Sequence, residues 1–100
     1  MAMKYKIEYI STFYSDLIDF ISFLENFPRK AGRILEKIDK LLIGLAHAPE
    51  MYQVYEDLPV FRKISVEDYL IFYKIDEANK VVEIHRLIYG RMDIKSHLQK

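Results

Sequence analysis

Residues 69–89 read YLIFYKID, EANK and VVEIHRLIY, and this stretch decides the fold. Both outer segments are dense in β-branched and aromatic residues, and the first alternates with the period of two that is typical of a strand. The four residues between them, 77–80, suit a polar turn. The stretch therefore predicts a β-hairpin of residues 69–76 and 81–89. Because the second strand is rich in Val, Ile and Leu, we expect it at the centre of the sheet.

The flanking segments extend this hairpin. Residues 60–66 predict a preceding antiparallel strand, and residues 4–10 alternate in the same way and predict a strand near the N-terminus. Between these strands, apolar residues recur at steps of three and four over 13–27 and 28–49, which is the pattern of two amphipathic helices. A run of helices followed by a run of strands indicates an α+β fold rather than an alternating α/β fold.

We expect an α-helical hairpin packed on one face of a curved, mostly antiparallel sheet. The break at Phe27 and Pro28 leaves almost no loop between the helices, so they should lie antiparallel. Ser11 and Thr12 are expected to cap the first helix. Residues 60–89 form a three-stranded antiparallel meander, and the N-terminal strand must take an edge or insert beside a later strand. The other face of the sheet is then left for solvent or for a partner.

Composition limits the classes of function. One hundred residues suit a single domain spanning 1–100, and 15 basic residues balance 15 acidic ones, for a net charge of zero. This balance disfavours non-specific binding to nucleic acid, which depends on basic residues contacting phosphates. The chain has no cysteine, no apolar run of membrane-spanning length and no signal-peptide pattern. We therefore expect a cytoplasmic protein without disulfide bonds.

No standard catalytic motif is present. The three glycines do not form a phosphate-binding loop, and His47, His85 and His97 lie on different predicted elements, so we expect no cofactor and no metal. Strand alternation predicts that His85 and Tyr89 point the same way, and a sheet-packing role for His85 is favoured over a general base. Arg86 lies within an apolar strand and should have a carboxylate partner. The candidates for that carboxylate are Glu56, Asp57 and Glu67.

Polar and aromatic residues near the last strands are the candidate binding residues. Tyr89, Gly90 and Arg91 end the central strand, where side chains can extend beyond the sheet. A tyrosine and an arginine there can bind phosphate, stack on a base or dock a protein partner. A packing role for Tyr89 is equally compatible with the pattern. The predicted partner-binding residues are Arg86, Tyr89, Arg91, Lys63 and Tyr69.

The last forty residues resemble the RelE/ParE toxins of bacterial type II toxin–antitoxin systems, the plasmid stabilisation protein family. Residues 69–76 are similar to the family's tyrosine-rich strand, and VEIHRLIYGRMD at 82–93 is similar to its V-x-I-x-R pattern followed by two hydrophobic residues and H-G-R-R-D. The segment 62–64, Arg-Lys-Ile, resembles the family's arginine-bearing strand. The order of strand, helical hairpin and strands agrees over nearly the whole chain. The resemblance implies a toxin kept silent by a cognate antitoxin that wraps around it.

The family contains two activities, and both are kept as hypotheses. RelE-like members cut mRNA on the ribosome, and in that case the resemblance implicates Tyr89, Arg91, Arg62 and His85 in metal-independent catalysis. ParE-like members inhibit DNA gyrase by binding. Leu70 stands where RelE-like enzymes carry a strand arginine, and Tyr89 replaces the usual histidine, so a ParE-like gyrase inhibitor is the favoured interpretation. A non-toxic antitoxin-binding module is the third hypothesis. A homodimer and a toxin–antitoxin hetero-oligomer are both compatible with the sequence.

Overall fold

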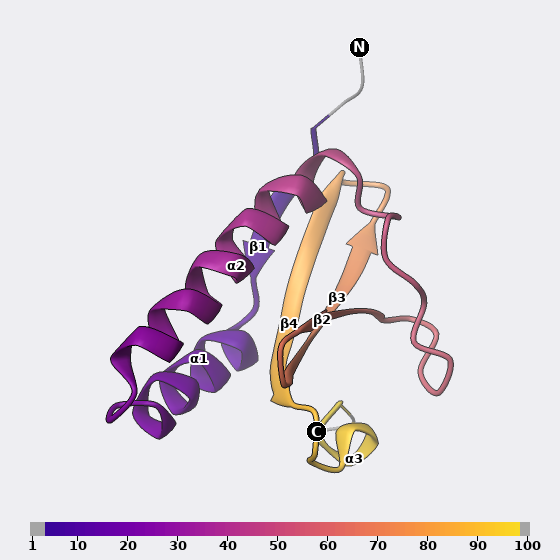
Figure 1. The fold of residues 1–100 in the computed structure, drawn as a ribbon. Helices are drawn as coiled ribbons and strands as arrows, with labels where there is room; N and C mark the ends of the chain where they lie inside the picture. Colours follow the sequence, from indigo (N-terminus) through magenta and orange to yellow (C-terminus); the bar gives the residue numbers. More distant parts are fainter. Residues whose placement is uncertain (1–3, 99–100) are drawn as a thin grey trace.

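The computed structural model, which describes residues 4–98, confirms the α+β fold (Figure 1). Its elements are β1 (Lys6–Tyr9), α1 (Ser11–Phe23), α2 (Pro28–His47), β2 (Arg62–Val66), β3 (Tyr69–Asp76), β4 (Val81–Tyr89) and α3 (Ile94–Leu98). The strands form one sheet in the order β1-β4-β3-β2, in which β1 is parallel to β4 and the other pairs are antiparallel. The central position of β4 and the edge position of β1 agree with the sequence pattern.

The main hydrophobic core lies between the helical hairpin and one face of the sheet. Strand alternation points Ile71 and Tyr73 of β3 toward the helices, and both side chains are fully buried. Phe13 and Phe20 of α1 and Ile38 of α2 meet them, because apolar residues three or four apart share one face of a helix. Burial of each large side chain of this kind contributes about 1.5–3 kcal/mol. Helix packing therefore determines which face of the sheet is covered.

The other face of the sheet is less open than expected. Phe61, Phe72, Ile88 and Leu98 form a second buried cluster, and the segment 49–59 and α3 pack over it. Part of that segment runs beside β2, where the Tyr55 amide donates to the Phe61 carbonyl at 2.9 Å and the Lys63 amide donates to the Gln53 carbonyl at 3.2 Å. The expectation of a free second face was incomplete because this segment has no regular apolar period.

The helix boundaries differ from those expected. The N-cap of α1 is Ile10, which offers no side-chain hydrogen bond, so the predicted capping by Ser11 and Thr12 is wrong. The helix ends at Phe23, and residues up to Phe27 form a turn. The second helix, α2, begins at Pro28 as expected. Within residues 4–98, none of the helices combines the length and apolarity needed to cross a bilayer.

A turn with a left-handed residue attaches α2 to the sheet. Glu67, between β2 and β3, has a φ of 53°. Its carboxylate accepts hydrogen bonds from Arg33 at 2.9 and 3.0 Å and from Lys37 at 2.9 Å, both on α2. These hydrogen bonds lower the pKa of Glu67 to about 2. Because the cations are half exposed, the pairs orient the helix more than they stabilise the fold.

Tyr73 joins β3 to the segment that follows α2, and its removal should weaken the fold. Its buried hydroxyl donates to the Pro49 carbonyl at 2.7 Å. Tyr73→Phe leaves that buried carbonyl without its donor, so we expect the free energy of unfolding in urea to fall by about 1–2 kcal/mol at neutral pH.

The same variant has a pH signature. Burial raises the pKa of Tyr73 to about 12, above the value near 10 of an unfolded tyrosine. The contribution of the Tyr73 hydroxyl to the free energy of unfolding is therefore complete below pH 10 and is lost as the pH rises toward 12. The difference in unfolding free energy between wild type and Tyr73→Phe should shrink across this interval. A difference that stays constant from pH 9 to pH 12 would contradict the assignment.

Candidate functional site

A β-bulge in β4 decides which side chains meet at the end of the sheet. The register between β3 and β4 shifts between Phe72 and Tyr73, which leaves His85 as an extra residue in β4. Two residues of the bulged strand then oppose one residue of its neighbour, so the strict alternation of side chains is interrupted. As a result, Ile84 and Leu87 both contribute to the core beneath the helices.

The bulge separates His85 from Tyr89, so the prediction that they point the same way is wrong. The His85 ring lies edge-on to Phe61, with 5.4 Å between centroids, on the outer face, and its Nε2 is 3.2 Å from Glu83 Oε1. The Tyr89 ring instead packs 5.5 Å from the ring of Tyr69, which belongs to the helix-covered core. The sheet therefore stands between these two side chains.

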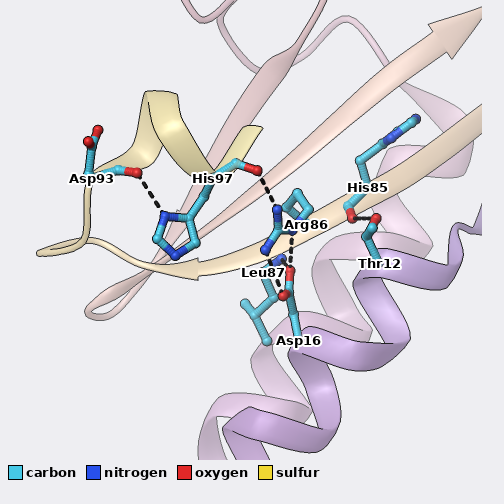
Figure 2. A network of polar contacts seen from close by, with 7 residues as sticks. All are labelled: Thr12, Asp16, His85, Arg86, Leu87, Asp93 and His97. Atoms are coloured by element: carbon cyan, nitrogen blue, oxygen red, sulfur yellow. Dashed lines mark hydrogen bonds and ion pairs between the residues drawn. The ribbon is translucent and has the colours of Figure 1, made fainter. Parts of the chain in front are cut away.

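Helix α1 completes the edge of β4 beyond the point where β1 ends. After Tyr9, the chain enters α1, and two side chains of the helix bond the open edge of the strand (Figure 2). The Thr12 hydroxyl donates to the His85 carbonyl at 2.7 Å, and the Asp16 carboxylate accepts from the Leu87 amide at 2.9 Å. Four helical residues rise about 6 Å, and two strand residues span about 6.6 Å. The two spacings match, so the helix replaces a neighbouring strand.

Arg86 joins three elements. Its Nε and Nη2 donate to the two oxygens of Asp16 at 2.7 and 2.9 Å, and its Nη1 donates to the His97 carbonyl in α3 (Figure 2). Only 14% of the Arg86 side chain and 12% of the Asp16 side chain are exposed. The expected carboxylate partner therefore exists, but it lies on α1. The three predicted candidates, none of which pairs with Arg86, were Glu56, Asp57 and Glu67.

These contacts border a pocket of about 360 Å³ between α1, the end of β4 and the segment leading to α3. Its walls include aromatic side chains: Phe20 contacts Tyr69 edge-on at 5.1 Å, and Tyr89 lies beside Tyr69. Phe23 and Met92 border it and are 73% and 51% exposed. A concave, mainly apolar surface that also carries the charged side chains of Asp16, Asp19 and Arg86 is suited to anchoring a side chain of a protein partner. Sequence reasoning identified Tyr69, Tyr89 and Arg86 as candidates, but it did not identify Phe20, Phe23, Met92 or Asp16.

The remaining candidates lie apart from this pocket. The Arg62 guanidinium donates to the Tyr52 carbonyl at 2.7 Å and so holds the segment that follows α2. Lys63 places its ammonium 5.5 Å above the Tyr55 ring. Arg91 is exposed, just past the end of β4. Within residues 4–98, no group of three or more histidine or acidic side chains is placed to hold a metal ion.

The strand register shows how far apart two of the candidate catalytic residues lie. Tyr89 is opposite Tyr69, which is opposite Val66 at one end of β2, whereas Arg62 lies at the other end of that strand. Four residues along a strand span about 13 Å. Tyr89 and Arg62 are therefore too distant to act together on one phosphate, and Tyr89 and Arg91 are the two candidates that share the end of β4.

The fold and the site define a small α+β domain with a largely apolar pocket at the end of β4, and sequence comparison gives its family. A model of the ParE toxin of type II toxin–antitoxin systems, parDE, matches residues 7–94. The chain therefore belongs to the ParE toxin family, which confirms the resemblance seen in the sequence. A comparison with curated proteins gives no significant match.

Solved structures share the fold at low sequence identity. The toxin–antitoxin complex RelBE2 from Mycobacterium tuberculosis matches with a TM-score of 0.64 and 20% identity, over 86% of this chain and 98% of that chain. The chromosomal ParDE system from P. aeruginosa matches with 0.70 and 15%, over 89% and 98%. A free-state double arginine-to-alanine variant of E. coli RelE matches with 0.68 and 16%, over 95% and 93%. At these identities the matches establish the fold alone.

The ion pair at the base of the pocket should matter for stability. Asp16→Ala leaves the largely buried Arg86 charge without its carboxylate, so we expect a loss of about 3 kcal/mol in the free energy of unfolding, measured in urea. Asp19→Ala, three residues along the same helix at an exposed position, is the matched control and should change it by less than about 0.5 kcal/mol. Equal losses in the two variants would show that the pair has no special role.

Proposed function

We propose that this protein is the toxin of a type II toxin–antitoxin pair and that it inhibits DNA gyrase by binding, without cutting RNA. The observation that carries the proposal is that two of the four residues considered for catalysis, His85 and Arg62, lie apart from the other two, Tyr89 and Arg91. His85 lies on the outer face beside Phe61, whereas Tyr89 lies at the helix-covered side. Arg62 stabilises a loop near the opposite end of β2.

General acid–base chemistry requires titratable groups within hydrogen-bond reach of one reacting atom. Two cations that could assist Tyr89 are engaged elsewhere: Arg86 is paired with Asp16, and Arg62 donates to backbone carbonyls. Together, Tyr89 and Arg91 present an aromatic ring and a positive charge at the end of β4. Tyrosine and arginine at such a position are characteristic of protein-binding hot spots. The membership in the ParE family supports the same choice.

We further infer that a cognate antitoxin binds this chain. The support is the family, and the fact that two of the similar structures are described as a toxin–antitoxin complex and a toxin–antitoxin system. The pocket beside Tyr89, with exposed Phe23 and Met92 at its border, offers an apolar surface that a partner can cover. A cytoplasmic location is part of this proposal, because gyrase and its inhibitor must meet.

A single hydroxyl distinguishes binding from RNA cleavage. Tyr89→Phe keeps the ring but removes the only proton that Tyr89 could transfer. If the protein acts by binding, this variant should inhibit gyrase supercoiling of relaxed plasmid within about twofold of wild type. Arg91→Glu reverses an exposed charge at the end of β4 and should weaken inhibition about tenfold, which corresponds to about 1.4 kcal/mol.

The RNA-cleaving alternative is read out in the same cells. Primer extension on translated messages should show intact mRNA during growth arrest by the wild-type chain. Cut messages that disappear in Tyr89→Phe, together with unimpaired supercoiling by gyrase, would replace the proposal with a ribosome-dependent endoribonuclease. Normal growth of cells that produce the wild-type chain without an antitoxin would instead support a non-toxic antitoxin-binding module.

A further inference from the structure

Helix α1 carries an apolar face that nothing in residues 4–98 covers. Tyr14, Ile18 and Ile21 follow one another at steps of four and three, so they lie on one side of the helix, and they are 52%, 67% and 49% exposed. Tyr9, 41% exposed, extends this row, because its ring lies 5.9 Å from the ring of Tyr14. These four residues form what we call the outer patch.

The outer patch contains no charged residue of its own, and Asp39 of α2 is a charge that lies near its Tyr9 end. The two charged residues of α1, Asp16 and Asp19, both line the pocket on another side of the helix, and Asp16 is paired with Arg86. The other exposed polar residues of α1 are serines and a threonine. By contrast, the exposed face of α2 carries both signs of charge, including Glu36, which is paired with Lys40 four residues on. The outer patch thus offers apolar contact along α1, with the Asp39 charge only near its Tyr9 end.

The area of the outer patch reaches what a weak specific dimer needs. If a large side chain offers roughly 200 Å² when fully exposed, the four exposed fractions correspond to roughly 400 Å² of apolar surface. An interface core is about 65% apolar, so one copy would bury roughly 600 Å². Two copies would bury about 1,200 Å² in total, which is the lower limit of specific, stable interfaces.

We propose that the outer patch binds the same patch of a second copy of this chain. In a two-fold symmetric contact, the same patch of both copies forms the interface. An apolar row without charges can therefore pack against its copy, whereas a row of like charges would repel its copy. Antiparallel packing of the two α1 helices places Ile18, the middle residue of the row on α1, near the two-fold axis and Tyr14 beside Ile21 of the other copy. The pocket at the end of β4 stays open in this dimer, because it lies on a different side of α1. The proposal does not depend on the identity of the target.

Sedimentation equilibrium of the purified full chain tests the dimer. The mass should rise with concentration from the 12.0 kDa of one chain toward twice that value, with half-conversion at micromolar concentrations, as expected for a small interface. Ile18→Asp buries two like charges at the axis and should stay monomeric at concentrations at least tenfold higher. Val60→Asp is the matched control, since Val60 is 60% exposed, close to the 67% of Ile18, but lies outside the helices, and it should dimerise like wild type. Circular dichroism verifies that both variants fold.

A cross-link tests the geometry. Because the chain has no cysteine, Ile18→Cys supplies one thiol per copy, and two α-carbons near the axis can come within the 4.4–6.8 Å that a disulfide requires. Under mild oxidation Ile18→Cys should form a covalent dimer much faster than Val60→Cys. A wild-type chain that stays monomeric at every concentration overturns the proposal. An Ile18→Asp variant that dimerises normally also overturns it. The same holds if substitutions in the outer patch change only the binding of a separate antitoxin.

Discussion

The structure depends most on the contact that Arg86 makes with Asp16 and with the carbonyl of His97. This one guanidinium connects α1 with β4 and α3, and its partner on α1 lies 70 positions away in the chain. Desolvation of a charged pair is costly, and it is offset here by two parallel hydrogen bonds to the carboxylate and a third to the backbone. A lysine could not reproduce this arrangement, because its ammonium lacks the planar fork of donors. The contact therefore positions the helix and the C-terminal segment that border the aromatic pocket.

The bulge at His85 and the hydrogen bonds from α1 both occur where β4 loses its neighbour β1. A strand that loses its neighbour after Ile84 exposes backbone groups, and Thr12 and Asp16 satisfy two of them. The extra residue shifts β4 by one position, so Leu87 packs beneath the helices and Tyr89 reaches the pocket. Without the bulge, strict alternation from Ile84 would point Arg86, rather than Leu87, toward the helices. The irregular part of the strand is thus what forms the site.

The sequence predicts the regular part of this protein well, because periodicity reports local structure. The hairpin of residues 69–89, the helical hairpin and the central place of the last strand all follow from apolar spacing. The partner of Arg86 does not, since Asp16 lies 70 positions away and a carboxylate on a helix has no periodic signature. The predicted direction of the His85 side chain was wrong for a related reason, because a bulge changes the strand register without a change in composition. The cover over the outer face was missed because residues 49–59 fold through tertiary contacts alone.

The parallel pairing of β1 with β4 has a consequence for how the molecule is made. Lys6 to Tyr9 align with Val81 to Ile84, so the first strand has no neighbour in the sheet until the last strand exists. Contacts of such long sequence separation close late and slow the folding of a small domain. During synthesis, the helices and β2 can pack early, but the pocket cannot form then, because part of its wall comes from β4 and the residues after it. The pocket is consequently incomplete until β4 and the residues after it have been synthesised.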